Sequence, residues 1–166
     1  MFRRVSARRA LLAATACAAV IATGCGEKDE PAPASAAAAI AEGDEICTAV
    51  GEEISTLRAD AAPKTPQDAA RLTEQVLSVH EQEIADLRAL TVPDDLRSDL
   101  DRYLVARERG LEPLREGLDA ARAGNPTAYA QAQADAAAGQ VRRTELARAV
   151  GFRECSLPAA SGVPPG

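Results

Sequence analysis

The chain has 166 residues, of which 46% are hydrophobic and only 2% aromatic, and it carries a formal net charge of −6. Such an acidic chain is a poor partner for nucleic acid and for anionic lipid headgroups, because like charges repel. The scarcity of aromatic rings also argues against a surface on which sugars or unpaired bases would stack.

The amino terminus has the pattern of an export signal. Residues 1–9 contain four arginines and no acid, and residues 10–23 form a continuous stretch of apolar or small side chains. This order predicts a secretory signal peptide over residues 1–24, too short for a permanent transmembrane helix. Arg8-Arg9 ahead of Ala10-Leu11-Leu12 is also typical of twin-arginine signals, so the general and the twin-arginine export routes both stay open.

The end of this signal predicts a lipid anchor. Ala22-Thr23-Gly24-Cys25 resembles the lipobox of bacterial lipoproteins, although Ala22 stands where leucine is commonest. The resemblance implies that the Cys25 sulfur receives a diacylglycerol, that the cysteine becomes the new N-terminus, and that it carries acyl chains such as palmitate. The alternative is ordinary cleavage after Ala14-Thr15-Ala16, which would leave Cys25 as a plain thiol.

Lipidation would hold the protein at the extracytoplasmic face of the cell membrane. Loss of residues 1–24 removes four arginines and leaves 15 basic against 25 acidic residues, a net charge of −10. A chain of this charge is repelled by anionic headgroups and by nucleic acid. We therefore expect the membrane contact to be the lipid alone.

Composition divides the mature chain into three parts. Residues 25–44 contain the expected lipidated cysteine and a flexible tether rich in proline, alanine and acids, which has little to bury. The alanine run of this segment could instead extend the first helix backward from Ser35. Residues 45–157 are expected to form the folded domain, and residues 158–166 a disordered tail.

Two cysteines remain after Cys17 is lost with the signal and Cys25 is lipidated. Cys47 and Cys155 stand near the two ends of the expected domain. An even pair in an exported chain predicts a disulfide, because a metal site would need more ligands at closer spacing. Two free thiols are the alternative.

Apolar residues between these cysteines recur at helical spacing, and no stretch shows sustained strand alternation, which predicts an all-α domain. The first helix is expected over about 45–61. The second is expected to begin at Pro66, with Thr65 as its N-cap, and to end before Val92-Pro93.

The third helix is expected to begin at Asp94 and to bend, rather than break, at Gly110 and Pro113. The fourth is expected as one helix from Pro126 to Val150. Short connections make each helix antiparallel to the previous one, so we predict an up-down-up-down four-helix bundle closed by one disulfide.

Charged residues that fall on the apolar faces indicate a possible site. On a helical wheel Arg107 lies within the apolar face of the third helix and Arg143 within that of the fourth. Glu83 lies centrally on the second helix with His80 beside it, and Glu53 of the first helix could approach Arg143. Because a buried charge is tolerated only when it is paired, we predict a polar layer of Glu53, His80, Glu83, Arg107 and Arg143.

This polar layer has two interpretations. One is a self-satisfied ion network that fixes the register of the helices. The other is a pocket near the bend at Gly110 and Pro113, in which the two arginines hold a carboxylate or another small anion.

Two resemblances bear on this chain. His80-Glu81-Gln82-Glu83 resembles the His-x-x-Glu element of imelysin-like helical proteins, but it lacks the preceding glycine of that motif. The lipobox, the Ala/Pro tether, the cysteine at the start of the first helix, "LTVPDDL" and "AVGFREC" together resemble a group of small actinobacterial lipoproteins. The second resemblance implies a location and a fold, and it adds nothing on chemistry.

The leading functional hypothesis is a non-enzymatic, membrane-tethered helical domain that binds an extracytoplasmic protein partner or a small ligand, without a cofactor. A metal- or haem-binding domain that uses His80 and nearby carboxylates is the second hypothesis. The Glu-x-x-His pairs of a di-iron bundle and a Cys-x-x-Cys-His haem motif are absent from the sequence. An enzyme is the third hypothesis, because no serine, cysteine or carboxylate set has a spacing that suggests nucleophilic or acid/base catalysis.

Overall fold

The computed structural model describes residues 35–60 and 63–157. All regular structure in these residues is helical: α1 (Ala36–Asp60), α2 (Pro66–Ala89), α3 (Asp94–Arg109), α4 (Glu112–Arg122), α5 (Pro126–Ala138), α6 (Gln140–Val150) and a short 3₁₀ helix, η1 (Glu154–Ser156). The predicted all-α class is therefore confirmed. The expected signal peptide, Cys25 and the tail at 158–166 lie outside the described residues.

None of the helices that the structure describes combines the length and the apolar character needed to cross a bilayer.

Helix α1 begins at Ala36, well before the expected start near Glu45. Ser35 caps it, since its Oγ accepts a hydrogen bond from the Ala38 N–H at 3.1 Å. Gly43 is buried against the ring of Phe152. Of the two alternatives for residues 36–44, the structure shows the backward extension of the first helix from Ser35 rather than a flexible tether, and small side chains there pack against the end of the domain.

Helix α2 begins as the sequence predicts. Thr65 Oγ1 accepts a hydrogen bond from the Asp68 N–H at 3.1 Å, and the Asp68 carboxylate accepts one from the Thr65 N–H at 3.2 Å. This capping box, with Pro66 in the first turn, satisfies backbone donors that the helix itself leaves unpaired.

The expected third helix is divided into α3 and α4. Pro113 has no N–H to donate to the carbonyl of Arg109, so the hydrogen-bond ladder is interrupted there. The intervening Gly110 and Leu111 keep right-handed backbone angles, with φ of −68° and −78°. The chain therefore bends at this junction and its helical hydrogen bonding is interrupted there. The expectation of one bent but unbroken helix is thus wrong.

The expected fourth helix is also divided, and the prediction of one helix from Pro126 to Val150 is wrong. Helix α5 ends at Ala138 and α6 begins at Gln140, with Gly139 between them. Glycine is a poor helix former. In addition, Nη2 of Arg143 donates a hydrogen bond of 2.9 Å to the carbonyl oxygen of Ala136, in the last turn of α5.

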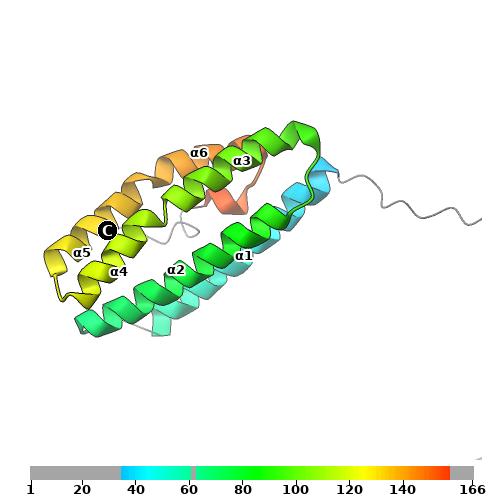
Figure 1. Ribbon diagram of the computed structural model, residues 1–166. Coiled ribbons are helices and arrows are strands. Elements are labelled where there is room, and N and C mark those ends of the chain that lie inside the picture. Colours follow the sequence, from blue (N-terminus) through cyan, green and yellow to red (C-terminus); the bar gives the residue numbers. More distant parts are fainter. Residues whose placement is uncertain (1–34, 61–62, 158–166) are drawn as a thin grey trace, which may run out of the picture. The chain divides into compact units, whose positions relative to one another are not determined.

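The helices pack in pairs around one main core. Figure 1 shows α1 and α2 side by side, and the pairs α2 with α4, α3 with α6, and α4 with α5 are also in contact. The largest fully buried side chains include Tyr103 and Phe152, whose rings meet edge to face with centroids 5.9 Å apart. Phe152 reaches this position because Gly151, with φ of 102°, ends α6 in the left-handed conformation.

Two contacts join the first helix to the end of the domain. The predicted disulfide between Cys47 and Cys155 is confirmed, and it connects α1 to η1 across a sequence separation of 108. Beside it, Asp44 Oδ1 accepts hydrogen bonds from the backbone N–H groups of Arg153 at 2.8 Å and Glu154 at 2.9 Å. The carboxylate thus caps η1 from a neighbouring helix.

Candidate functional site: a buried ion network beside an arginine-lined groove

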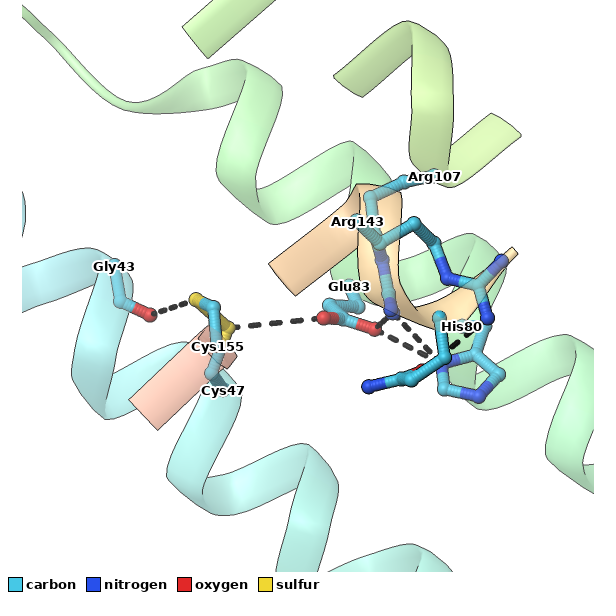
Figure 2. A network of polar contacts seen from close by, with 8 residues as sticks. Gly43, Cys47, His80, Glu83, Arg107, Arg143 and Cys155 are labelled. Atoms are coloured by element: carbon cyan, nitrogen blue, oxygen red, sulfur yellow. Dashed lines mark hydrogen bonds and ion pairs between the residues drawn. A yellow bond between two sulfur atoms is a disulfide. The ribbon is translucent and has the colours of Figure 1, made fainter. Parts of the chain in front are cut away.

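Three of the five predicted polar residues meet inside the domain. His80 and Glu83 come from α2 and Arg107 from α3, and their exposed fractions are only 3%, 0% and 6%. The Arg107 guanidinium donates to Oε2 of Glu83, and His80 Nδ1 lies 2.9 Å from that oxygen. Figure 2 shows these side chains converging on the carboxylate.

The ring of His80 can serve only one of its two neighbours through Nδ1. That nitrogen lies 2.9 Å from Glu83 Oε2 and 3.0 Å from Arg107 Nη2, and it cannot donate and accept at once. We assign the proton to Nδ1, because an ionised carboxylate is the strongest acceptor nearby. Nε2 is then the unprotonated nitrogen of the ring.

His80 is neutral in this network. Burial lowers the pKa of His80, and the positive charges of Arg107 and Arg143 act in the same direction, while the hydrogen bond to Glu83 opposes them. One cation and one anion therefore remain, and they cancel. This closed cluster fits the interpretation as an ion network that fixes helix register.

The second oxygen of Glu83 faces the disulfide. Glu83 Oε1 lies 3.7 Å from the sulfur of Cys47, and the sulfur of Cys155 lies 3.6 Å from the carbonyl oxygen of Gly43 (Figure 2). Sequence spacing gave no signal for this contact, because the residues lie on different helices. The disulfide therefore covers one side of the buried carboxylate.

Tyr103 is the other buried polar group near this cluster. Its ring is fully buried, and its hydroxyl has no hydrogen-bond partner among the described residues. Burial raises the pKa of Tyr103 to about 12, and the charge of Glu83 acts in the same direction. No local signal in the sequence predicts its position beside charged groups.

Arg143 occupies a different environment from Arg107. It is half-buried on α6, and its Nη2 donates to the carbonyl of Ala136 at 2.9 Å and to Oε1 of Gln140 at 3.3 Å. No carboxylate among the described residues pairs with it. Its hydrogen bonds within the described part of the chain thus go to neutral oxygens.

Two glycines make room for the Arg143 guanidinium. A Cβ atom at Gly110 would lie 3.0 Å from Nη1 of Arg143, and one at Gly139 would collide with the same nitrogen. These glycines are the residues at which the two expected long helices are interrupted. The breaks in the helices and the position of the arginine are therefore linked.

Burial is unfavourable for this cation. It lowers the pKa of Arg143, and the like charge of Arg107 lowers it further. The charge of Glu83 opposes both effects, and an anion placed against the guanidinium would oppose them further, because it would stabilise the charged form.

A groove of about 510 Å³ lies over Arg143, between the α3–α4 junction and the α5–α6 junction. Its lining combines charged side chains with apolar ones. The charged residues are Asp101, Arg102, Arg109, Asp135, Arg142 and Arg143, and the apolar ones are Val105, Ala106, Pro113 and Leu146. A volume of this size is in the range of small-molecule sites.

Glu53 does not belong to the site, which corrects the prediction. It lies on the exposed side of α1, next to the fully buried Ile54, and none of the described residues forms an ion pair with it. Helix α1 packs mainly on α2 and η1, so Glu53 has no approach to Arg143. The five-residue layer is therefore a three-residue network with one arginine beside it.

Metal binding by His80 and nearby carboxylates is the second hypothesis from the sequence. Within residues 35–60 and 63–157, no group of three or more His, Cys, Asp or Glu side chains could hold a metal ion. His80 and Glu83, the residues of the metal hypothesis, are engaged with Arg107.

Comparison with known proteins adds no relative. No protein-family model, no curated protein and no solved structure matches this chain.

Proposed function

We propose that this chain is a non-enzymatic lipoprotein, anchored through Cys25 at the extracytoplasmic face of the cell membrane, whose helical domain binds a small anionic ligand. The lipobox-like Ala22-Thr23-Gly24-Cys25 and the basic and apolar residues before it support the anchor. The groove over Arg143 supports the ligand.

In this proposal the domain is an up-down-up-down four-helix bundle. The pair α3 and α4 counts as one bent helix of the bundle, and the pair α5 and α6 counts as another. Its support is the set of neighbours: α1 on α2, α2 on α4, α3 on α6 and α4 on α5. The short connections between successive helices favour this topology.

One observation carries the ligand proposal. Arg143 presents a guanidinium to a groove of about 510 Å³ and has no carboxylate partner among the described residues. A guanidinium that is partly desolvated and lacks a counter-ion attracts an anion, and carboxylates fit its planar donors best.

The second inward arginine does not contribute to this site. Arg107 is engaged with the buried Glu83, so the anion meets Arg143 and the more exposed Arg109 instead. Both interpretations of the polar layer thus apply, each to a different arginine.

The ligand is tested by calorimetric titration of the full mature chain with a panel of small carboxylates and inorganic anions. Arg143→Gln is expected to weaken binding at least about tenfold, which corresponds to one charge-assisted hydrogen bond. Arg148→Gln is the matched control, because Arg148 is exposed on the same helix and does not line the groove. Equal binding by both variants, or no binding by the parent chain, would contradict the proposal.

The anchor is tested by intact mass determination on protein from the native membrane fraction, before and after reduction. We expect a chain that begins at Cys25 with added acyl mass, and a gain of two hydrogens on reduction of the disulfide. A water-soluble chain without acyl mass would show that the protein is secreted without an anchor.

A further inference from the structure

The groove over Arg143 has an apolar wall as well as a charged one. Its apolar lining comes from Val105 and Ala106 of α3, Pro113 of α4 and Leu146 of α6. Val105 is 44% exposed, and it is among the few large hydrophobic side chains that the described residues leave open to solvent. An exposed apolar side chain at the edge of a groove often marks a contact with a ligand.

We infer that the ligand is an amphiphilic monocarboxylate, a single carboxylate on an aliphatic body. The carboxylate lies on Arg143 and the aliphatic part lies along Val105, Ala106, Pro113 and Leu146. This inference rests on the proposed function, since it specifies which anion the groove takes.

The charges of the groove favour a single carboxylate over a polyanion. Nη2 of Arg143 already donates to Ala136 and Gln140, which leaves the N–H groups of Nη1 and Nε for a ligand. Two of the four arginines in the lining are already paired with acids outside the groove, so Asp101 and Asp135 would repel additional negative charge.

The position of the guanidinium suits one planar acceptor. Nη1 lies in the space that Gly110 and Gly139 leave open, and both glycines line the same groove. A carboxylate there can accept a charge-assisted hydrogen bond from Nη1, and it gains the parallel Nη2 donor where it displaces the longer, 3.3 Å hydrogen bond to Gln140. The aliphatic part then leaves water for the apolar wall, which is favourable in proportion to the area covered.

The test is calorimetric titration of the full mature chain with acetate, hexanoate, octanoate, octanol and inorganic phosphate, all below their micelle concentrations. Affinity should rise about threefold to fourfold for each methylene group that enters the groove. Octanol lacks the charge and phosphate lacks the chain, so each should bind at least about tenfold more weakly than octanoate.

Variants separate the two halves of the site. Val105→Ser should weaken octanoate at least about threefold and leave acetate unchanged, because only the longer ligand reaches the apolar wall. Val141→Ser is the matched control: Val141 is 68% exposed on α6, does not line the groove, and its substitution should change neither ligand. Arg143→Gln should weaken both.

The outcomes distinguish this inference from the proposed function. If acetate or phosphate binds as tightly as octanoate, the amphiphilic ligand is wrong while the anion site stands. If octanoate binding is equally affected by Val105→Ser and Val141→Ser, the chain binds nonspecifically and the inference is overturned. If no anion binds at all, both proposals fall.

Discussion

Arg107 and Arg143 both lie on inward faces of their helices, yet they meet different surroundings. Arg107 is 6% exposed and paired with a carboxylate that no solvent reaches. Arg143 is half-buried and, within the residues that the structure describes, donates only to a backbone carbonyl and an amide. An arginine on an apolar helix face therefore does not have one fixed role. Where a carboxylate of the domain pairs with it, the arginine stabilises the fold; where none does, we propose that it binds a ligand.

The difference follows from the cost of burying charge. A fully buried cation needs an anion beside it, and removing that anion leaves an uncompensated charge in a medium of low dielectric constant. A cation at the edge of the domain stays partly hydrated, so it is tolerated without an anion beside it before a ligand binds. Substitutions that remove one member of each environment should therefore behave differently.

The largest effect is expected when Glu83 is replaced by leucine. Arg107 then stays buried without its anion, and the free energy of unfolding should fall by about 3–5 kcal/mol. Urea unfolding followed by circular dichroism measures this change. The double variant Glu83→Leu with Arg107→Met should recover part of the loss, because it removes both charges.

Glu81→Leu is the control for that substitution. Glu81 lies on the same helix and pairs with Arg115 at 2.9 Å, with both side chains close to half exposed. Exposed ion pairs contribute about 0–1 kcal/mol, so this variant should be nearly as stable as the parent. Equal losses for Glu81→Leu and Glu83→Leu would show that the buried network has no special role.

Alkaline pH should lower the stability of the folded domain through ionisation of Tyr103, which is buried near the ion network. Its pKa is raised from 10.0 to about 12 in the folded state, so the unfolded chain ionises first. Stability is therefore full below pH 10 and is lost as the pH rises toward 12, by about 3 kcal/mol when complete. Unfolding measured over this range should show the loss in the parent chain.

Tyr103→Phe should remove this alkaline loss. It also removes a buried hydroxyl that has no partner among the described residues, so stability at neutral pH should stay the same or increase. A parent chain and a phenylalanine variant with the same alkaline profile would contradict the assignment.

Mild acid should lower the stability of the domain through protonation of His80 in the network with Glu83 and Arg107. Its pKa is lowered from 6.5 in the folded state, so the unfolded chain takes up a proton first as the pH falls. The contribution is fully present above about pH 6.5, and it is lost as the pH falls from there through the folded-state pKa. His80→Gln should flatten the pH dependence of the urea midpoint in this window, whereas an unchanged profile would assign it to the carboxylates.

Only a small loss of stability is expected for Arg143→Gln. The variant loses a cationic cap on the last turn of α5, worth about 0.3–1 kcal/mol, and no buried anion is left behind. The urea midpoint should therefore shift little, although ligand binding is lost. A loss of more than about 3 kcal/mol would place Arg143 in the structural network with Arg107.

Local signals in the sequence predicted much of the fold. The predicted cap at Thr65 and the predicted start at Pro126 located two helix starts, and the structure shows a side-chain cap at each, from Thr65 and from Asn125. The cysteine pair also predicted the disulfide correctly. These features depend on neighbours along the chain or on a rule of chemistry, so no tertiary information was needed.

The errors arose where tertiary contacts decide the outcome. Helix α1 starts early because Phe152 packs on Gly43, and α5 separates from α6 where Arg143 reaches back to Ala136. Glu53 was expected to approach Arg143, but the sequence could not tell which helices are neighbours. In the same way, inward periodicity found both arginines but could not assign a carboxylate to only one of them.

The disulfide also has a consequence for proteolysis. Cys47 and Cys155 close a covalent ring that includes every helix from α2 to α6. A protease that cuts once within this ring, for example at the exposed turn of Gly124 and Asn125, produces two fragments that remain one covalent molecule. The cut domain would separate on a gel only after reduction, so a nicked molecule whose disulfide is intact keeps both halves of its groove together.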